Sequence, residues 1–493
     1  MGMTKGLNGR RGWMLATLSA ALVLAGCGNN HHSASGQGIP VAQTRFLVST
    51  AAYTATLSSA VSASSQTIVY SMPAVTGSGT VTARAVVLVP KGTPPVQGWP
   101  MVVWAHGTTG VADGCEPSAT SDLAQYDGLV AQLLQRGFMV VAPDYEGLGH
   151  SPTSNHPYLN RDSEARSMLY AAMAAREQVA AAGLRWVAMG HSQGGHAALA
   201  AAELASEASQ AGGLQLRGVV ALAPASNLEV ALAGLGQQIT ALEAPLKTLI
   251  QQATALQAQA QAAQSAGNLA EAQQLAAQAQ AKQAEVQQWL ASSAGQAALG
   301  QATALTVQLN LFGSLVVAGE RAVMPSLQFS DVFGARGAAI AASSEQTGIC
   351  NPQLVAQLGS TAPAQLGDVV RYVQVEQQLP STYPGLRLDF TSTAAGQDFL
   401  NRSRIGTRAL NVPVLVLQGE QDTTVPRQLT DMLIGQMVQA GNPRTTVPET
   451  SLPQANLGVN YQVLGASGSQ SVDHGSVVTA GAPSMLAFLN QVR

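Results

Sequence analysis

The sequence predicts an α/β fold, in which buried parallel strands alternate with helices along the chain. Five short runs are mostly apolar throughout, as expected for strands of a parallel sheet that is covered on both faces. These runs are Met101–Ala105, Phe138–Ala142, Arg185–Met189, Gly218–Leu222 and Val412–Leu417. Helical patterns lie between or after them, at Asp122–Arg136, Ser163–Ala181, Gly194–Ala208 and Arg427–Ala440. This alternation is typical of α/β proteins, and Thr80–Val89 precedes it as a strand that we expect to be antiparallel.

A long insertion interrupts the alternation at residues 228–405, and we expect it to form a mostly helical cap. Apolar residues recur at spacings of three and four between Leu232 and Leu256, as on one face of a helix. Pro245 lies within this segment, where a proline kinks or splits a helix. The α/β core is therefore expected in two parts, residues 46–227 and residues 406–493.

The middle of this insertion has low sequence complexity. Residues 251–300 are rich in Ala and Gln, and both residue types favour helix. Ser265–Asn268 breaks the run and predicts a helical hairpin. Such helices are more typical of a spacer or a self-association surface than of a substrate site. Residues 232–294 are therefore a candidate surface for self-association.

The first 27 residues have the features of a bacterial export signal. Its positive region holds Lys5, Arg10 and Arg11. The apolar run Trp13–Ala25 that follows is too short to span a bilayer. It ends in Leu-Ala-Gly-Cys, which is similar to a lipobox and predicts cleavage after residue 26 and acyl chains on Cys27.

Several acyl chains on Cys27 would hold the protein stably at a membrane, because one chain alone gives only marginal binding. Residues 27–45 are polar and glycine-rich and are expected to form a tether. We therefore expect a lipoprotein of the cell envelope, in the outer membrane, at the cell surface or facing the periplasm. An ordinary signal peptide would instead give a secreted protein.

The composition argues against nucleic acid as a partner. The net charge is −3 over 493 residues, and the chain has no basic block that could track phosphates. Apolar residues make up 46% of the chain and charged residues 10%, which allows a large core and excludes a wholly disordered protein.

Two cysteines, Cys115 and Cys350, remain beyond the predicted lipidation site. Two thiols in an oxidising compartment are a plausible disulfide pair. Because the sequence does not show whether they are close in space, two unpaired thiols remain the alternative. A bridge would join the loop after Met101–Ala105 to the region before the last third of the chain.

A strand-to-helix corner carries the strongest functional signal, Gly190-His191-Ser192-Gln193-Gly194. It fits G-x-S-x-G, the nucleophile elbow, in which small residues allow a sharp turn around a strained serine. A short apolar strand precedes it, and a helix rich in small residues follows it. The sequence therefore predicts Ser192 as a nucleophile, with the helix N-terminus favouring negative charge beside it.

A serine needs a base to take its proton and an acid to orient that base, and in this fold the chain order is serine, acid, histidine. The segment Val412–Pro426 runs from an apolar strand into an acidic turn, where Asp422 is the predicted acid and Glu420 is its rival. His474 is the predicted base, because no other histidine follows Asp422.

The other polar residues near these motifs are given structural roles. Asp144 follows a strand but precedes the serine, so we expect it to stabilise a turn. His191 and His196 flank the nucleophile and are expected to shape the elbow. His150 and His156 are expected to make structural hydrogen bonds, and the histidines show no metal-ligand spacing.

An oxyanion hole needs two backbone N–H groups aimed at the carbonyl oxygen of the substrate. One is expected from Gln193, directly after the nucleophile. The other is expected from the loop His106–Gly110, with Thr108 preferred and Thr109 as the alternative.

These motifs together resemble those of the secretory lipase family, α/β-hydrolases of the yeast lipase A type. The matching runs are WAHGTTG, PDYEGLG, HPYL, GHSQGGHAAL, VPVLVLQGEQDTTVP and DHGSVV. The resemblance covers residues from about 80 to 228 and from about 405 to the end. It implies an α/β-hydrolase fold with a helical cap after the sixth strand, a triad of Ser192, Asp422 and His474, and a Cys115–Cys350 disulfide. The Ala/Gln-rich hairpin is not part of the family pattern.

The expected function is hydrolysis of lipid or other carboxylic esters through an acyl-enzyme, with no cofactor and no metal. An acyltransferase or a peptidase would use the same triad, because the fold alone does not decide the reaction. A non-enzymatic surface lipoprotein that uses the fold as a scaffold is the remaining alternative.

Overall fold

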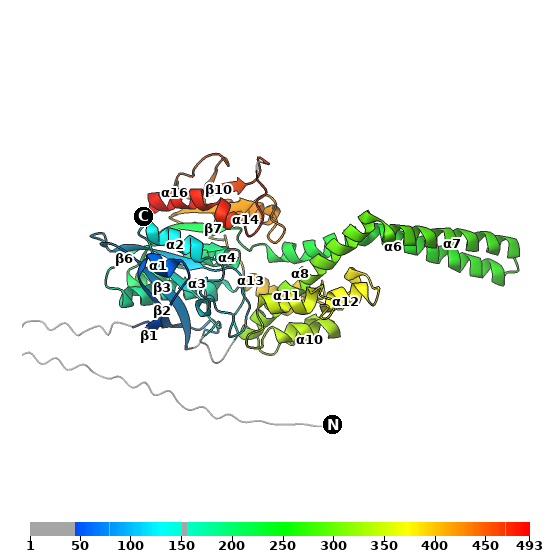
Figure 1. Ribbon diagram of the computed structural model, residues 1–493, viewed down its shortest axis with the longest axis horizontal. Helices are drawn as coiled ribbons and strands as arrows, with labels where there is room; N and C mark the ends of the chain where they lie inside the picture. The colour runs from blue at the N-terminus through cyan, green and yellow to red at the C-terminus, as the bar shows by residue number, and fades with distance from the viewer. Residues whose placement is uncertain (1–44, 78, 150–154, 469) are drawn as a thin grey trace, which may run out of the picture. The chain divides into compact units, whose positions relative to one another are not determined.

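The computed structural model describes residues 45–77, 79–149, 155–468 and 470–493, and within them ten strands form one sheet (Figure 1). The strand order is β1-β2-β3-β5-β4-β6-β7-β8-β10-β9. The strands are β1 (Leu47–Ala52), β2 (Ser62–Pro73), β3 (Thr80–Pro90), β4 (Trp99–Ala105), β5 (Met139–Pro143), β6 (Ala182–His191), β7 (Gln215–Leu222), β8 (Pro413–Gly419), β9 (Arg444–Thr446) and β10 (Gly458–Leu464).

The centre of the sheet is parallel, as the apolar runs predict. Strands β5, β4, β6, β7, β8 and β10 pair in parallel, and β3 pairs antiparallel with β5. The sequence analysis did not identify β1 and β2, which form an antiparallel edge. Ser, Thr and Ala dominate β1 and the first half of β2, so these segments lack the apolar signal of a buried strand.

Helices cover both faces of the sheet, and alternate residues of β4 show this. Met101, Val103 and Ala105 belong to a core cluster with α3 (Arg161–Gln178), α4 (Gln193–Glu203) and α14 (Arg427–Gln439). Val102 and Trp104 belong to a second cluster with α2 (Asp127–Gln135) and α16 (Ala482–Val492). The strand is therefore buried on both faces. The predicted helix after the nucleophile ends early, because Leu204 separates α4 from α5 (Ala205–Gly212).

Helices make up most of the insertion between β7 and β8. The long ones are α6 (Leu228–Ser265), α7 (Leu269–Ala291) and α8 (Ser293–Val323). The short ones are α9 (Phe329–Val332), α10 (Ala335–Ser343), α11 (Asn351–Gly359), α12 (Asp368–Gln374) and α13 (Ala394–Arg402). Pro245 lies inside α6 without splitting it. The proposed limits of the cap, 228–405, and of the two core segments remain predictions.

The predicted hairpin is present, and α6 and α7 lie side by side in Figure 1. The side chains of α6 and α7 that are buried beyond Ile250 are all alanines: Ala253, Ala260, Ala263, Ala272 and Ala279. Small side chains allow the two helices to approach closely but bury little apolar area. Helix α8 is the one described helix long and apolar enough to cross a membrane, and 72% of its most apolar window is buried, as in a core helix.

Candidate active site

Ser192 occupies the sharp corner between β6 and α4, with φ of 58° and ψ of −117°. This conformation is strained for a residue with a side chain, and strain of this kind persists only where the surroundings enforce it. The Ser192 N–H donates to the carbonyl oxygen of Leu222 at 2.9 Å, and the Ser192 carbonyl accepts from Ala225 and His196 at 3.1 Å. Backbone contacts with the end of β7 therefore hold the corner.

The two flanking glycines are required by close backbone packing. A Cβ on Gly194 would lie 1.9 Å from the carbonyl oxygen of Ala105, and a Cβ on Gly190 would lie 2.1 Å from that of Gly194. Any side chain at either position would collide with backbone atoms. The structural reason for small residues in G-x-S-x-G thus applies to this chain.

Ser192, His474 and Asp422 come together although 282 positions separate the serine from the histidine. The Nε2 of His474 lies 2.9 Å from the Oγ of Ser192. The Nδ1 of His474 lies 2.7 Å from the Oδ2 of Asp422, whose side chain is fully buried. Because the carboxylate accepts the proton on Nδ1, the lone pair on Nε2 faces the serine.

Asp422 is held in this position by its own turn. Its Oδ1 accepts from the backbone N–H groups of Thr424 and Val425 at 2.9 and 2.8 Å. Glu420, the rival acid, forms an ion pair with Arg427 at 2.8 Å instead. The geometry therefore favours Asp422 over Glu420.

His191 has a contact that the sequence analysis did not foresee. Its Nε2 donates to the backbone carbonyl of His474 at 2.8 Å, and its Nδ1 accepts from the hydroxyl of Tyr126 at 2.8 Å. Burial lowers the pKa of His191 to about 3, so the ring is neutral near pH 7. No motif in the sequence links Tyr126 to the nucleophile.

Asp144 has a contact away from Ser192 and His474, in keeping with the turn-stabilising role expected for it. It is buried, and its Oδ1 accepts from the backbone N–H of Ser118 at 2.9 Å. Burial raises its pKa to about 7. Its contact joins the loop after β5 to the loop after β4, which is a structural role. His150 lies outside the described residues, as does Cys27.

The predicted oxyanion loop is fixed from the cap side. Asn351 donates through Nδ2 to the carbonyl of Thr108 at 2.8 Å and through its backbone N–H to the carbonyl of Thr109 at 2.9 Å. Cys350, directly before it, forms a disulfide with Cys115, with a Cα–Cα distance of 5.4 Å. The predicted disulfide is therefore confirmed.

Two cavities share Ser192 in their lining. One, of about 230 Å³, is mostly apolar and lies between the core and the cap helices, lined by Ala225, Leu232, Leu235, Phe312, Val316 and Leu429 among others. The other, of about 500 Å³, also contains His474, Thr108, Tyr126 and Asn351. Phe312 of α8 lines both cavities. The serine hydroxyl thus lies where an apolar pocket meets a larger opening.

Comparisons with known proteins bear on the family and the fold of this chain, and not on its individual site residues. The secretory lipase family model matches residues 116–302, which include the elbow but not Asp422 or His474. No curated protein is similar enough in sequence to match the chain.

Many solved structures share this fold, and the three that follow match most of the chain. A ligand-bound form of the rice cell wall degrading esterase LipA from Xanthomonas oryzae has a TM-score of 0.54 at 19% identity, covering 91% of this chain and 95% of that one. Candida antarctica lipase A in its closed state has a TM-score of 0.54 at 14% identity, covering 91% and 83%. A putative hydrolase from Legionella pneumophila has a TM-score of 0.52 at 13% identity, covering 91% and 96%.

The fold is therefore that of an α/β-hydrolase, with a helical insertion. Within that class, the family match confirms the resemblance to the secretory lipases and identifies a carboxylic ester hydrolase. Its substrates are esters, and a secreted or extracellular location follows from the family.

Proposed function

We propose that this protein hydrolyses carboxylic esters through an acyl-enzyme on Ser192. The observation that carries the proposal is the hydrogen-bonded series of Ser192 Oγ, His474 and Asp422, with distances of 2.9 and 2.7 Å. This arrangement is that of a nucleophile, a general base and an orienting acid.

The reaction follows from the positions of the protons. His474 takes the Ser192 proton on Nε2 while Ser192 Oγ bonds to the ester carbonyl carbon. The imidazolium that forms is stabilised by Asp422, which stays ionised. The C–O bond to the alcohol then breaks, and His474 gives its proton to the leaving oxygen. Water repeats the two steps on the acyl-enzyme and releases the acid.

The backbone N–H groups of Gln193 and Thr108 are proposed to bind the oxyanion. Gln193 is the first residue of α4, where a helix leaves its N–H groups without partners and favours negative charge. Thr108 lines the same cavity as Ser192 and His474. Donors fixed in advance avoid reorganisation in the transition state, and removal of one typically costs ~10²–10³ in rate.

The two cavities are proposed to hold the two halves of the ester. The apolar cavity between α6, α8 and the loop before α14 suits an acyl chain, because burial of its methylene groups is favourable. The opening on the His474 side suits the alcohol, whose oxygen must reach the protonated base. The cap would then shield the acyl-enzyme from bulk water.

The proposal is tested with a Ser192→Ala variant and a chromogenic butyrate or octanoate ester. We expect turnover and labelling by a fluorophosphonate to be lost while the fold is retained. Ser58→Ala is the matched control, since Ser58 is a buried serine whose hydroxyl has no partner among the described residues. Unchanged turnover in Ser192→Ala would refute the mechanism.

Acyl transfer and peptide cleavage use the same groups and are separated by product analysis. With a competing alcohol present, a hydrolase releases mainly the free acid, whereas an acyltransferase releases mainly the new ester. A peptide substrate tests the third possibility. The apolar pocket beside Ser192 favours the ester of an acyl chain over a peptide as the substrate.

The hairpin of α6 and α7 is proposed to mediate self-association and not catalysis. Its outer surface carries few charges, and low net charge promotes association. A double variant, Ala258→Glu with Ala277→Glu, places carboxylates on the exposed face of the hairpin and leaves its buried alanines unchanged. We expect a lower sedimentation mass with unchanged ester turnover. An unchanged sedimentation mass would refute self-association through the hairpin. A loss of ester turnover together with a lower mass would favour a role in catalysis.

Lipid attachment at Cys27 is proposed from the export signal alone. A Cys27→Ser variant should move from the membrane fraction to the soluble fraction, and labelling with a radioactive fatty acid should be lost. If the variant kept both its membrane association and its fatty-acid label, lipid attachment at Cys27 would be refuted. An uncleaved or ordinary signal peptide would then be the remaining interpretation.

A further inference from the structure

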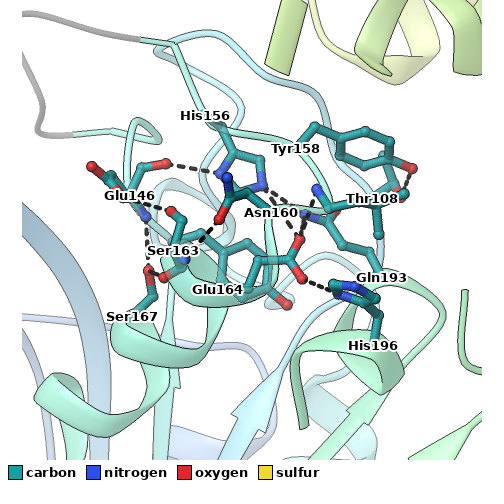
Figure 2. Close-up of polar contacts among 12 residues, drawn as sticks. Thr108, Glu146, His156, Tyr158, Asn160, Ser163, Glu164, Ser167, Gln193 and His196 are labelled. Atoms are coloured by element: carbon teal, nitrogen blue, oxygen red, sulfur yellow. Dashed lines mark hydrogen bonds and ion pairs between the residues drawn. The ribbon is translucent and has the colours of Figure 1, made fainter. Parts of the chain in front are cut away.

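A second buried polar cluster includes Gln193, the residue directly after Ser192, and the proposed mechanism does not use the side chains of this cluster (Figure 2). Its members Glu164, His156 and His196 are fully buried, and Gln193 is 1% exposed. Glu164 comes from α3, and Gln193 and His196 come from the first turn of α4. A buried carboxylate is costly unless it is paired, so its presence beside the site calls for a physical reason.

Glu164 is the centre of the cluster. Its Oε2 lies 2.6 Å from Nδ1 of His196, and its Oε1 accepts from Nε2 of Gln193 at 2.7 Å. Oε1 also accepts from the backbone N–H of Leu159 at 3.1 Å. The other nitrogen of His196 faces the carbonyl of Ser403 at 2.9 Å. His196 is therefore held by hydrogen bonds at both ring nitrogens, one to Glu164 and one to the carbonyl of Ser403.

Gln193 is held by two acceptors at once. Its amide nitrogen donates one hydrogen to Glu164 and lies 2.6 Å from Nε2 of His156. His156 accepts there, because its Nδ1 donates to the carbonyl of Glu146 at 2.8 Å. Burial lowers the pKa of His156, which keeps the ring neutral and able to accept. The side-chain orientation of Gln193 is therefore determined by its hydrogen bonds to Glu164 and His156.

The same cluster reaches the other side of the proposed oxyanion hole. The chain continues from His156 to Tyr158, whose hydroxyl lies 3.0 Å from the Oγ1 of Thr108. Figure 2 shows Tyr158 and Thr108 at the upper right, above Gln193 and His196, with Glu146 and Ser167 at the left. Gln193 is thus bonded to the cluster directly, whereas Thr108 is linked to it through Tyr158, whose backbone N–H donates to the carbonyl of His156 at 2.8 Å.

We propose that the Glu164–His196 pair, with His156 and Tyr158, positions the two backbone donors of the oxyanion hole relative to each other. This inference rests on the proposed function. Glu164, His156 and Tyr158 are positioning residues, since they act through Gln193 and Thr108. The network should lower the free energy of the tetrahedral state and leave binding of the ground-state ester almost unchanged.

Two variants cut the network without changing any backbone donor. Gln193→Met removes the amide and keeps the length of the side chain, and Tyr158→Phe removes only the hydroxyl. We expect each to lower kcat by about 10- to 100-fold with little change in KM, because misplacement by ~1 Å can cost 10²-fold. The inhibition constant of a trifluoromethyl ketone should rise in parallel, since its adduct with Ser192 places an oxyanion in the hole.

A double-mutant cycle tests the link between Tyr158 and Thr108. Thr108→Val removes the same hydrogen bond as Tyr158→Phe, so the double variant should be no slower than the slower single variant. Tyr70→Phe is the control, because Tyr70 is fully buried and its hydroxyl donates only to the backbone of Ser167 at 2.8 Å. It should lose stability but keep kcat and the inhibition constant.

The outcomes separate this inference from the proposed function. If Ser192→Ala is inactive but Gln193→Met and Tyr158→Phe keep the wild-type kcat and inhibition constant, the positioning role is refuted and the mechanism stands. If Ser192→Ala keeps its turnover, the mechanism itself fails. Additive effects in the cycle would likewise refute the coupling between Tyr158 and Thr108.

Discussion

The imidazole of His191 donates a hydrogen bond to the backbone carbonyl of His474, so the residue before the nucleophile holds the main chain of the proposed base. The two rings lie 4.6 Å apart between centroids. His474 belongs to a loop between β10 and the C-terminal helices, and a loop alone positions a side chain less rigidly than a strand. The contact with His191 anchors that loop to the end of β6.

A His191→Leu variant should therefore have a lower kcat under conditions in which the protein stays folded. We expect a loss of at least about tenfold in kcat, since a misplaced base departs from the reactive geometry. Tyr126→Phe should give a smaller loss, because it removes the partner of Nδ1 but leaves the bond to His474. Ester hydrolysis under saturating substrate measures both, and equal activity in wild type and His191→Leu would contradict the anchoring role.

The apolar cavity offers a test of acyl-chain length. Gly234 of α6 lines this cavity, and a Cβ at this position would meet no atom within 4 Å. Gly234→Leu should fill the cavity without a clash and without loss of helix stability. We expect the octanoate-to-acetate ratio of kcat/KM to fall by about tenfold or more, since one methylene changes discrimination by ~10–200-fold.

Gly300→Leu is the matched control for this change. Gly300 lies on α8, also has open space around its Cβ position, and does not line either cavity at Ser192. Its acyl preference should equal that of the wild type. The same shift in both variants, or no shift in Gly234→Leu, would show that the cavity does not bind the acyl chain.

Loss of the Cys115–Cys350 disulfide should lower both the free energy of unfolding and kcat. The bond closes a sequence separation of 235 residues, and chain entropy predicts a stabilisation of roughly 5 kcal/mol as an upper value. It also holds Asn351 against the carbonyls of Thr108 and Thr109. Cys350→Ser should therefore unfold at lower denaturant concentration and have a lower kcat at temperatures where it is folded. A normal kcat would show that Asn351 holds the loop without the disulfide.

Local sequence rules were sufficient to select Ser192, Asp422 and His474, whose side chains lie within hydrogen-bonding distance in the structure, and to predict the central strands. Ser192 was identified by the need for small neighbours at a sharp turn, and His474 by the order of the triad along the chain. The parallel strands were identified because burial on both faces leaves a continuous apolar run. These features depend on residues near one another in the sequence or on a rule of the fold.

The remaining features depend on contacts between distant segments. Glu164 has the sequence context of an ordinary polar helix residue, and only the packing of α3 against α4 brings it to Gln193. The bond between His191 and His474 joins positions 283 residues apart. The choice between Asp422 and Glu420 depended on side-chain direction in one turn, which the sequence pattern leaves open.

Asp144 provides a test of pH-dependent stability that is independent of catalysis. Burial raises its pKa from 3.8 to about 7. Because the folded state holds this proton more tightly than the unfolded state, the stabilising contribution is present below pH 4 and is lost as the pH rises towards 7. Well above pH 7 the lost stabilisation no longer changes with pH. The rise in pKa from 3.8 to about 7 corresponds to roughly 4 kcal/mol in the free energy of unfolding.

Asp144→Asn resembles the protonated aspartate and keeps an oxygen for the backbone N–H of Ser118. The variant should match the wild type near pH 4 and become progressively more stable than the wild type up to pH 7, with a constant difference above that. Urea unfolding of both proteins across this range measures the difference. Asp113→Asn, a change at an exposed carboxylate, controls for the general effect of removing one charge. A difference that does not change with pH would mean that Asp144 stays ionised in the folded protein, with its charge compensated by Arg84 across the loop.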